Sequence, residues 1–504
     1  MNPVSEMTMA DLHQRTLKKQ KYLEDLGYIY RCKWEHEFDK EVIENPDTKA
    51  FVDTLNFVTP LEPREAFFGG RTEAFTLFKE ASDDDVIDYY DVTSLYPWVN
   101  KTGKVPLGHP HIVTENFEDI QNYEGLVKCR VLPPKGLYIP VLPYRSNGKL
   151  KFPLCRICAD MKSQEPCRCR DEDRAFTGTW MTDEVKKAVE KGYEILVIFE
   201  VWHFERGGVF TEYVNTFLKM KQEASGWPDW CRTEEQKQQY IREYYETEGI
   251  SLEYDDIKKN PGLRSLAKLM LNSFWGKLGQ RSNMTQVTYV TEPSVYFDML
   301  TSDEQEIQGV QFVGEEMVEI RWRNKDDFVV TSDKTNVVIA AYTTAQARLK
   351  LYSYLEHLGE RVLYCDTDSV VFTSKPLEWK PPLGDYLGNL TDEAPDSRII
   401  TFVTGGPKNY AYSKTKNNIV TTCCKVRGIT LNYRNALKID FDTIRDMVKA
   451  TIDRKDVRSV TVTDPSRICR GNRKIVSAVE HKDYRIVFDK RVMTGTPQTF
   501  PYGF

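Results

Sequence analysis

The stretch that most restricts the fold lies at residues 364–372, which read YCDTDSVVF. The apolar residues 362–364 and 370–372 predict two short buried strands, and Asp366 to Asp368 predict the turn of a hairpin between them. Two carboxylates on one tight turn repel each other. The fold can tolerate such a pair if the turn is exposed to water. A divalent cation explains the pair better, because Mg²⁺ takes one or two protein carboxylates and completes its shell with water and phosphate.

A third carboxylate follows an apolar run near the start of the chain, where residues 86–97 read VIDYYDVTSLYP. Residues 86–90 predict a strand with Asp91 at its end, and Pro97 is expected to end the turn after it. Two metal ions about 4 Å apart, held by shared aspartates, stabilise both the attacking and the leaving oxygen of an in-line phosphoryl displacement. Asp91, Asp366 and Asp368 therefore indicate phosphoryl transfer, which needs little beyond metals, phosphate-binding cations and positioning.

Residues 217–259 are charged and predict helices, and after Pro261 and Gly262 the chain continues as LRSLAKLMLNSFWGKLG. Apolar residues recur there at helical spacing on one face: Leu263, Leu266, Ala267, Met270, Leu271 and Phe274. A second face carries Arg264, Lys268, Asn272 and Trp275. This face is either the solvated side of a surface helix or, beside three carboxylates, a site for a triphosphate and a base.

Composition restricts the class of protein. The chain has 504 residues, 40% hydrophobic and 29% charged, which is typical of a globular protein of two to four domains. It has no apolar run of about eighteen residues, so no membrane span is predicted. The first residues lack the apolar core of a secretion signal, which favours an intracellular protein of the nucleus or cytoplasm. Eleven Cys, an odd number, favour reduced thiols or metal ligands over a disulfide framework.

Charge is distributed unevenly along the chain, although the net charge is only −6. From residue 401 onward, 20 Lys and Arg stand against 9 Asp and Glu, a net of +11, while the residues before it hold 49 and 66, a net of −17. A local basic face can bind phosphates whatever the total charge. The basic end is therefore either a nucleic-acid surface or simply a solvated one.

Four cysteines lie within fifteen residues, in CRICADMKSQEPCRC. Cys155 and Cys158 are separated by two residues, and Cys167 and Cys169 by one. Four thiolates favour a tetrahedral zinc site, although the gap in the second pair is tighter than the common two residues. The alternative is four reduced thiols without a metal.

These motifs together resemble family B DNA polymerases. DVTSLYP, KLMLNSFWG and YCDTDS are similar to motifs A, B and C of that family, in the same order and at similar spacing. PKNY resembles the family's Lys-x-Tyr element, which holds the primer terminus. The resemblance covers roughly residues 60 to 504. The wording NPGLRSLAKLMLNSFWGKLGQR and the ending VFDKRVMTGTPQTFPYGF resemble the protein-primed branch, especially polymerases of Polinton/Maverick transposons and related viruses and linear plasmids.

The resemblance implies a role for each carboxylate. Asp91 and Asp368 are expected to bind two Mg²⁺ ions, with Mn²⁺ as an alternative metal and the carbonyl of Val92 assisting. Asp366 is expected to support the site. The reaction implied is the addition of deoxynucleotides to a primer 3′-OH. The expected partners are template and primer DNA, deoxynucleoside triphosphates and a terminal protein.

The resemblance also implies where the nucleotide binds. Ser94 and Leu95 are expected to offer backbone N–H groups to phosphate. Tyr96 is expected to lie under the sugar, where its ring would clash with a 2′-hydroxyl, which predicts deoxynucleotide substrates. Lys268 is expected to contact the triphosphate, with Arg264 one helical turn earlier.

Four further residues complete the expected site. Asn272 is expected to shape the nucleotide pocket. Family members usually carry Tyr at the position of Trp275, so here a stacking face is kept and a hydroxyl is lost. Lys408 and Tyr410 are the expected primer-binding residues.

The fold implied is an α+β right hand, with an antiparallel-sheet palm, helical fingers and a basic thumb suited to duplex DNA. The expected boundaries are an N-terminal segment (1–75), palm with motif A (76–110), an insertion for the terminal protein that carries the Cys cluster (111–230), fingers with motif B (231–285), a second insertion that favours strand displacement (286–330), palm with motif C and Lys-x-Tyr (331–412), and thumb (413–504).

Family B members normally carry a proofreading exonuclease before the palm, whereas only 90 residues precede Asp91 here. Residues 39–41 match an acidic pattern of that exonuclease, but chance explains the match better, so we expect a polymerase region without it. Two alternatives stay open. One is a truncated, catalytically silent relic that only binds DNA, which the intact site residues disfavour. The other is a reverse transcriptase or RNA polymerase, in which adjacent aspartates and a small residue in place of Tyr96 would be expected.

Overall fold

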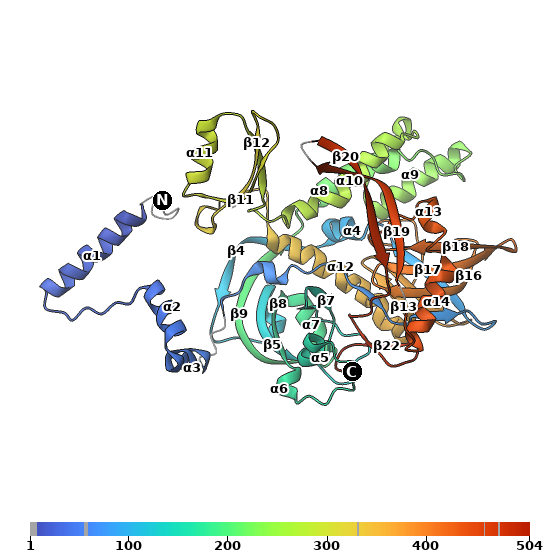
Figure 1. Cartoon of the computed structure of the whole chain (residues 1–504). Helices are drawn as coiled ribbons and strands as arrows, with labels where there is room; N and C mark the ends of the chain where they lie inside the picture. Colours follow the sequence, from blue (N-terminus) through green and yellow to red (C-terminus); the bar gives the residue numbers. More distant parts are fainter. Residues whose placement is uncertain (1–7, 55–58, 330–331, 458, 472–473) are drawn as a thin grey trace. The chain divides into compact units, whose positions relative to one another are not determined.

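The computed structural model describes residues 8–54, 59–329, 332–457, 459–471 and 474–504 (Figure 1). The remaining residues, which fall in the expected N-terminal segment, second insertion, palm and thumb, lie outside the described part. The chain divides into two compact units. One comprises Met1–Pro60, Arg281–Asp333 and Gly471–Lys474, and the larger one comprises Leu61–Gln280, Lys334–Arg470 and Ile475–Phe504. Among the described helices, none is both long and apolar enough to cross a membrane.

The smaller unit contains three N-terminal helices and a small sheet with one helix. Its elements are α1 (Met9–Asp25), α2 (Glu35–Glu44), α3 (Pro46–Thr54), β10 (Gln286–Val290), α11 (Pro293–Thr301), β11 (Gln305–Phe312) and β12 (Val318–Asn324). The strands are antiparallel in the order β10-β12-β11. On β12, the Trp322 Nε1–H donates to the Thr288 hydroxyl of β10 at 2.8 Å, which links the two strands through their side chains.

The larger unit is built on a nine-stranded antiparallel sheet. The main path is β1-β13-β14-β3-β16-β17-β18, with β15 paired to β3 and β2 paired to β16. Its strands are β1 (Thr72–Ala74), β2 (Phe78–Glu80), β3 (Val86–Val92), β13 (Val362–Asp366), β14 (Ser369–Ser374), β15 (Leu390–Asp392), β16 (Arg398–Gly406), β17 (Asn409–Lys416) and β18 (Ile419–Lys425). The antiparallel palm sheet expected from the resemblance is therefore confirmed.

Helices cover both faces of this sheet, which explains the uninterrupted apolar run of β14. Val370 and Phe372 pack in one core cluster with Leu351 of α12 (Val337–Leu358). Val371, between them in sequence, points to the other face and packs with Ile444 of α14 (Phe441–Ile452). Because successive residues of a strand face opposite sides, a strand buried on both faces shows no alternation in its sequence.

A second antiparallel sheet lies within residues 105–207, in the strand order β4-β9-β5-β8. Its elements are β4 (Val105–Val113), β5 (Gly125–Leu132), β8 (Phe176–Met181), α7 (Thr182–Glu190) and β9 (Glu194–Gly207). The segment between β5 and β8 carries a small hairpin and the cysteines, as β6 (Tyr144–Ser146), β7 (Lys149–Lys151), α5 (Arg156–Met161) and α6 (Asp171–Arg174).

Further helices of the larger unit are α4 (Leu95–Thr102), α8 (Thr211–Glu223), α9 (Glu234–Glu248) and α10 (Pro261–Leu278). The helix predicted after Pro261 is confirmed as α10. Asn260 caps it by accepting from the Leu263 N–H at 3.1 Å, and Pro261 occupies the first helical position. Of its apolar face only Ala267 and Leu271 are fully buried, and Leu271 packs against α8. Leu263 stays exposed.

Pro97 corrects one expectation. It does not end the turn after Asp91 but is the third residue of α4. The first turn of a helix accepts proline, because the N–H groups there have no intrahelical partner. The chain therefore passes from β3 into a helix after only Thr93 and Ser94, and Ser94 stands at the N-cap position of α4 without a side-chain capping bond.

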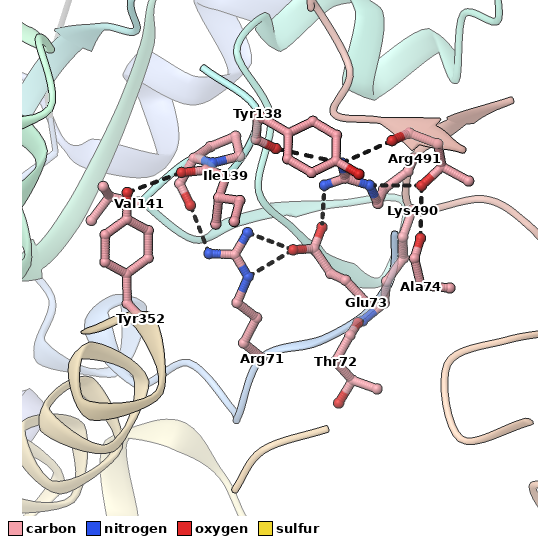
Figure 2. A network of polar contacts seen from close by, with 12 residues as sticks. Arg71, Thr72, Glu73, Ala74, Tyr138, Ile139, Val141, Tyr352, Lys490 and Arg491 are labelled. Carbon is pink, nitrogen blue, oxygen red and sulfur yellow. Dashed lines mark hydrogen bonds and ion pairs between the residues drawn. The ribbon is translucent and has the colours of Figure 1, made fainter. Parts of the chain in front are cut away.

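The C-terminal part continues from the palm sheet. It contains α13 (Tyr433–Ala436), α14, the two-stranded ribbon β19 (Val460–Gly471) and β20 (Lys474–Tyr484), and the short strands β21 (Val492–Met493) and β22 (Thr499–Phe500). A buried ionic network ties this part to the edge strand β1 (Figure 2).

Glu73 is the centre of that network and is 1% exposed. It accepts from Arg71 Nε at 2.7 Å and lies 3.4 Å from a terminal nitrogen of Arg491. The Nε–H of Arg491 donates to the Thr499 hydroxyl at 3.0 Å. Burial raises the pKa of the Glu73 carboxyl, but Arg71 and Arg491 outweigh it and hold the pKa below its ordinary value. Since β1 pairs with β13, the network supports the strand that ends at Asp366.

Candidate active site

Three aspartates meet where the hairpin lies beside β3. Asp366 faces Ser369 across the turn, and Ser369 faces Asp91 on β3. The Val92 N–H donates to the carbonyl of Asp368 at 2.7 Å. The predicted hairpin is therefore confirmed, and it brings all three expected carboxylates to the same end of neighbouring strands. The proposed use of the Val92 carbonyl as a metal ligand stays a prediction.

The backbone around these carboxylates adopts uncommon conformations. Thr367, between the two turn aspartates, has φ 61°, and its N–H donates to the Arg71 carbonyl at 2.7 Å. Gly70 permits this close approach, since a Cβ there would lie 2.6 Å from the Thr367 hydroxyl oxygen. Ser94 and Lys408 also have positive φ, at 52° and 59°. Left-handed non-glycine residues gather at functional sites more often than elsewhere, which marks this region as a candidate site.

Asp366 already has partners within the protein. Thr72 donates its hydroxyl to Asp366 Oδ1 at 2.8 Å, and Lys408 Nζ lies 3.2 Å from the same oxygen. One of its two carboxylate oxygens is thus engaged by a donor on the edge strand and by a cation on the next hairpin. This geometry suits a carboxylate that positions its neighbours.

Burial and neighbouring carboxylates raise the pKa values of Asp91 and Asp368. Burial raises the pKa of Asp91 to about 7, with Asp368, Glu393 and Asp366 adding to the effect and Lys268 opposing it. Burial likewise raises the pKa of Asp368 to about 6, with Asp366 adding to it. The carboxylates disfavour one another's charge, and a hard divalent cation held by their oxygens would offset this repulsion. The donor set therefore fits Mg²⁺.

Glu393 is a carboxylate that sequence reasoning missed. It directly follows β15, where Thr391 pairs with Asp91, and its own N–H donates to the Tyr89 carbonyl at 2.8 Å. Its side chain is exposed, and its charge raises the pKa of both Asp91 and Asp368. No motif marks it, because only the pairing of β15 with β3 brings it to the site.

The start of α4 supplies backbone donors beside the carboxylates. Ser94 is the residue before the helix, and the first N–H groups of a helix, including those of Leu95 and Tyr96, have no intrahelical acceptor. Such a helix start is suited to binding phosphate. The Thr93 N–H donates to the Asn389 carbonyl at 2.8 Å, which fixes the approach to the helix.

Tyr96 and Trp275 form an aromatic stack between α4 and α10. Their ring centroids lie 4.3 Å apart at 26°. Burial raises the pKa of Tyr96 to about 12, so its hydroxyl stays protonated. The indole nitrogen of Trp275 is buried and has no hydrogen-bond partner among the described residues, which leaves a donor available at this site. Asn272, nearly one turn earlier on α10, is exposed.

Three cations gather on α8 and α10. Burial lowers the pKa of Lys221, and the nearby charges of Arg264 and Lys268 lower it further, while Glu248 opposes them. Lys268 is also close enough to Asp91 to oppose the rise in its pKa. Three clustered cations favour a ligand with several negative charges. Sequence reasoning missed Lys221, because it lies on a separate helix forty-seven residues before Lys268.

Of the expected primer-binding residues, Lys408 lies at the turn between β16 and β17 and Tyr410 is the second residue of β17. The Lys408 N–H donates to the Tyr364 hydroxyl at 2.8 Å, and its Nζ reaches Asp366. The Tyr410 hydroxyl lies 3.0 Å from that of Tyr89. Lys408 is therefore joined directly to the carboxylate turn, whereas Tyr410 is buried in the sheet and contacts β3.

A basic hollow opens beside this turn. It encloses about 460 Å³ and is lined by Lys149, Arg427, Arg485 and Lys490, together with Asp483 and Asp489. Lys490 Nζ donates at 3.1 Å to the carbonyl of Thr72, the residue before Glu73 of the ionic network. A concave surface with an excess of cations next to Lys408 suits the phosphate backbone of a nucleic acid.

The four clustered cysteines lie outside this site, in the segment between β7 and β8. Cys155 and Cys158 are buried and Cys167 and Cys169 are half-buried. All four Sγ atoms lie within 4.8 Å of one another, and those of Cys158 and Cys169 are 3.9 Å apart. The expected convergence of the four thiols is confirmed, and their metal stays a prediction.

Comparison with known proteins agrees with this arrangement. The family described as DNA polymerase type B, organellar and viral, matches residues 61–229. The "Probable DNA polymerase" of Agaricus bitorquis is 22% identical over 400 residues, 75% of this chain and 43% of that protein. The "Probable DNA polymerase" of Neurospora intermedia is 22% identical over 327 residues, 60% of this chain and 26% of that protein. The DNA polymerase of Bacillus phage phi29 is 23% identical over 344 residues, 66% of this chain and 46% of that protein.

The fold has counterparts among solved structures. Phi29 DNA polymerase in complex with primer-template DNA and incoming nucleotide matches with a TM-score of 0.52 at 16% identity, covering 87% of this chain and 66% of that one. The primer-template complex without nucleotide also gives 0.52, covering 96% and 74%. The chain thus spans between about a quarter and just under half of the curated relatives that it matches. Residues 61–229 are thus similar to the organellar and viral type B DNA polymerases, and the chain has the α+β right-hand fold of the phi29 enzyme.

Proposed function

We propose that the chain is a template-directed DNA polymerase that adds deoxynucleotides to a primer 3′-OH by two-metal phosphoryl transfer. The observation that carries this proposal is the meeting of Asp91 on β3 with Asp368 at the hairpin turn, with Lys268 close enough to influence the pKa of Asp91. Carboxylates for metal and cations for phosphate are the two requirements of this chemistry. The family match and the fold support the same assignment.

Asp91 and Asp368 would hold two Mg²⁺ ions, with Mn²⁺ as an alternative. When bound, the ions supply charge that stabilises the attacking and leaving oxygens of the displacement. Asp366 holds Lys408 beside the carboxylates. We assign the four thiols at residues 155–169 to a separate, structural zinc ion.

The residues of the chain bind and orient the incoming nucleotide. Lys221, Arg264 and Lys268 neutralise the triphosphate, and the N–H groups at Ser94 and Leu95 hold a phosphate oxygen at the start of α4. These contacts place the α-phosphate in line with the primer hydroxyl, which is the positioning that phosphoryl transfer requires.

The aromatic stack selects the sugar and the base. Tyr96 is fixed from one side by Trp275, so its ring cannot easily yield to a 2′-hydroxyl. Asn272 and the unpaired indole N–H of Trp275 offer polar groups to the nucleotide. Lys408 and Tyr410 hold the primer terminus, and the basic hollow next to them binds its backbone.

Primer extension tests this function. The purified chain with Mg²⁺, an annealed primer and template, and the four deoxynucleotides should lengthen the primer according to the template. Changing one template base should change which nucleotide is added. DNA binding without any extension, with Mg²⁺ or with Mn²⁺, would instead identify a silent DNA-binding relic.

We further propose that replication is protein-primed, as in the Polinton-like branch. The sequence resemblance supports this, and so does the fold shared with the phi29 enzyme. A Ser, Thr or Tyr hydroxyl of a terminal protein can replace the primer 3′-OH, because the reaction needs only an oxygen nucleophile in line with the α-phosphate. Incubation with the cognate terminal protein, Mg²⁺ and labelled deoxynucleotide should label that protein. Deleting an exposed part of residues 110–215 should remove the labelling and spare extension of a DNA primer. If the deletion spares both reactions, this insertion is not the priming platform.

A further inference from the structure

The last residues of the chain pack against the cysteine cluster, although more than three hundred residues separate them in sequence. Tyr502 is completely buried, and its carbonyl accepts from the N–H groups of Leu154 at 2.7 Å and Cys155 at 3.2 Å. Gly503 has φ 92°, and a Cβ there would lie 2.4 Å from the Cβ of Cys155. Only glycine permits this approach. Figure 1 shows the C-terminus beside α5, the helix that Cys155 precedes and that contains Cys158.

A second contact joins the C-terminal segment to the loop between the two cysteine pairs. The N–H of Met493, on β21, donates to the side-chain oxygen of Gln164 at 2.9 Å. Gln164 lies between Cys158 and Cys167. The cysteine loop and the C-terminal segment therefore contact each other at two places, β21 and Tyr502.

The thiols have the geometry of a metal centre. In a tetrahedral four-thiolate zinc site, bonds of about 2.3 Å place the sulfurs about 3.8 Å apart, and Cys158 Sγ and Cys169 Sγ are 3.9 Å apart. The Cys158 N–H also donates to Cys155 Sγ at 3.5 Å, a contact that a metal-bound sulfur would strengthen.

A buried lysine near the cysteine cluster favours negative charge on the thiols. Lys151 is completely buried, donates to the Ala159 carbonyl at 2.5 Å and lies 5.0 Å from the Tyr502 ring. Burial lowers the pKa of Lys151 to about 8, and the nearby Asp160 carboxylate opposes this only in part. A buried ammonium needs compensating negative charge. Four thiolates on one Zn²⁺ carry a net charge of −2 and would add to the compensation that Asp160 gives.

We propose that Cys155, Cys158, Cys167 and Cys169 bind one zinc ion, and that this centre is a clasp that holds the C-terminal segment 492–504 on the palm. Zinc fixes the loop that offers the N–H groups of residues 154 and 155 and the side chain of Gln164. Without the metal, four adjacent thiols contribute no bond that holds this loop closed.

The clasp reaches the catalytic hairpin through β22. The Thr499 hydroxyl donates to the Ala74 carbonyl at 2.7 Å, and its N–H donates to the Phe75 carbonyl at 2.8 Å. The Leu77 N–H donates to the Pro497 carbonyl at 2.7 Å. These contacts hold β1 and the residues after it, and β1 pairs with β13, the strand that ends at Asp366. Release of the C-terminal segment would therefore loosen the edge of the catalytic sheet.

The test combines metal analysis with hydrogen exchange on the full chain, and it is independent of polymerase activity. Protein purified without chelator should contain about one zinc per chain. Removing the zinc should make the amides of Leu154, Cys155 and Thr499 exchange at least ~10-fold faster, because their protection reports local opening. Restoring zinc should restore protection.

Variants separate the metal from the clasp. The double change Cys167→Ser and Cys169→Ser leaves the two buried cysteines in place and should abolish zinc binding and C-terminal protection together. Cys32→Ser is the matched control, since Cys32 is exposed and lies outside the cluster, and it should keep both. Gly503→Ala keeps all four thiols and should keep zinc while the C-terminal segment exchanges faster.

Two results would overturn the proposal. Protein without zinc, and with four thiols that titrate freely, would refute the metal centre. Bound zinc whose removal leaves the exchange of residues 154, 155 and 499 unchanged would refute the clasp. Primer extension is measured separately, so a failure of the polymerase assignment leaves these outcomes readable.

Discussion

Replacing Glu73 with Gln should destabilise the palm strongly, although the change removes no atom from the active site. Glu73 neutralises two buried guanidiniums, those of Arg71 and Arg491, and all three side chains are at most 4% exposed. Glutamine keeps the shape and loses the charge. Removing one partner of a buried ion pair costs about 3–5 kcal/mol, because the remaining charge stays buried without compensation.

The expected size of the effect follows from the size of the unit. For several hundred residues, an unfolding entropy of about 2.1 cal/mol/K per residue turns this loss into a fall of roughly 4–6 °C in the unfolding temperature. Asp453→Asn is the control. It removes one charge from the ion pair with Lys455, whose side chains are 54% and 71% exposed, and should cost less than about 1 kcal/mol.

Differential scanning calorimetry at pH 7 compares the two variants with the unchanged chain. The pH dependence provides a second check. The pKa of Glu73 lies below its ordinary value of 4.5, so its contribution to stability is complete above that pH and is lost as the pH falls through the lower, folded value. Glu73→Gln should lose this part of the acid sensitivity. An unfolding temperature within about 1 °C of the Asp453→Asn variant would refute the reasoning, since exposed pairs contribute almost nothing.

Three further substitutions test the active site. Tyr96→Val should raise the ratio of ribonucleotide to deoxynucleotide incorporation about 10-fold or more, the factor that ~1.4 kcal/mol of relieved clash supplies; an unchanged ratio would show that another residue excludes the 2′-hydroxyl. Lys221→Ala should raise the KM for nucleotide about 10- to 100-fold, as expected for a lost charge-assisted contact of ~1.5–3 kcal/mol. The control Lys219→Ala should leave KM unchanged, because Lys219 lies on the same helix but pairs with Glu253 at the surface. Asp366→Asn should slow nucleotide addition less than Asp368→Asn does; the reverse order would exchange their assigned roles.

Local sequence patterns predicted the parts of the site that lie within one element. The apolar runs on either side of Asp366 and Asp368 predicted the hairpin, and the spacing after Pro261 predicted the helix that carries Lys268. These predictions succeeded because strand and helix periodicities are encoded over a few residues. The position of Pro97 was predicted wrongly, since proline is as acceptable in the first turn of a helix as in a loop.

Contacts between distant segments could not be predicted in this way. Lys221 joins the cations of α10 only because α8 packs against that helix, and Glu393 reaches the aspartates only through the pairing of β15 with β3. The burial of Tyr502 beside Cys155 depends on the path of the whole chain. In the sequence Lys221 and Glu393 stand in no motif, and the quoted C-terminal stretch that contains Tyr502 does not point to the cysteines. Only the fold brings the three residues to their partners.

Nucleotide addition by carboxylate variants tests the two-metal assignment most directly. Addition of one deoxynucleotide to an annealed primer is measured for the unchanged chain, Asp91→Ala, Asp368→Ala and the control Asp396→Ala, whose carboxylate is 82% exposed and pairs with Lys416. Primer-template binding is measured on the same preparations. Both site variants should bind DNA nearly as well as the unchanged chain and add no nucleotide, while the control stays active. Full activity in Asp91→Ala or Asp368→Ala would contradict the assignment.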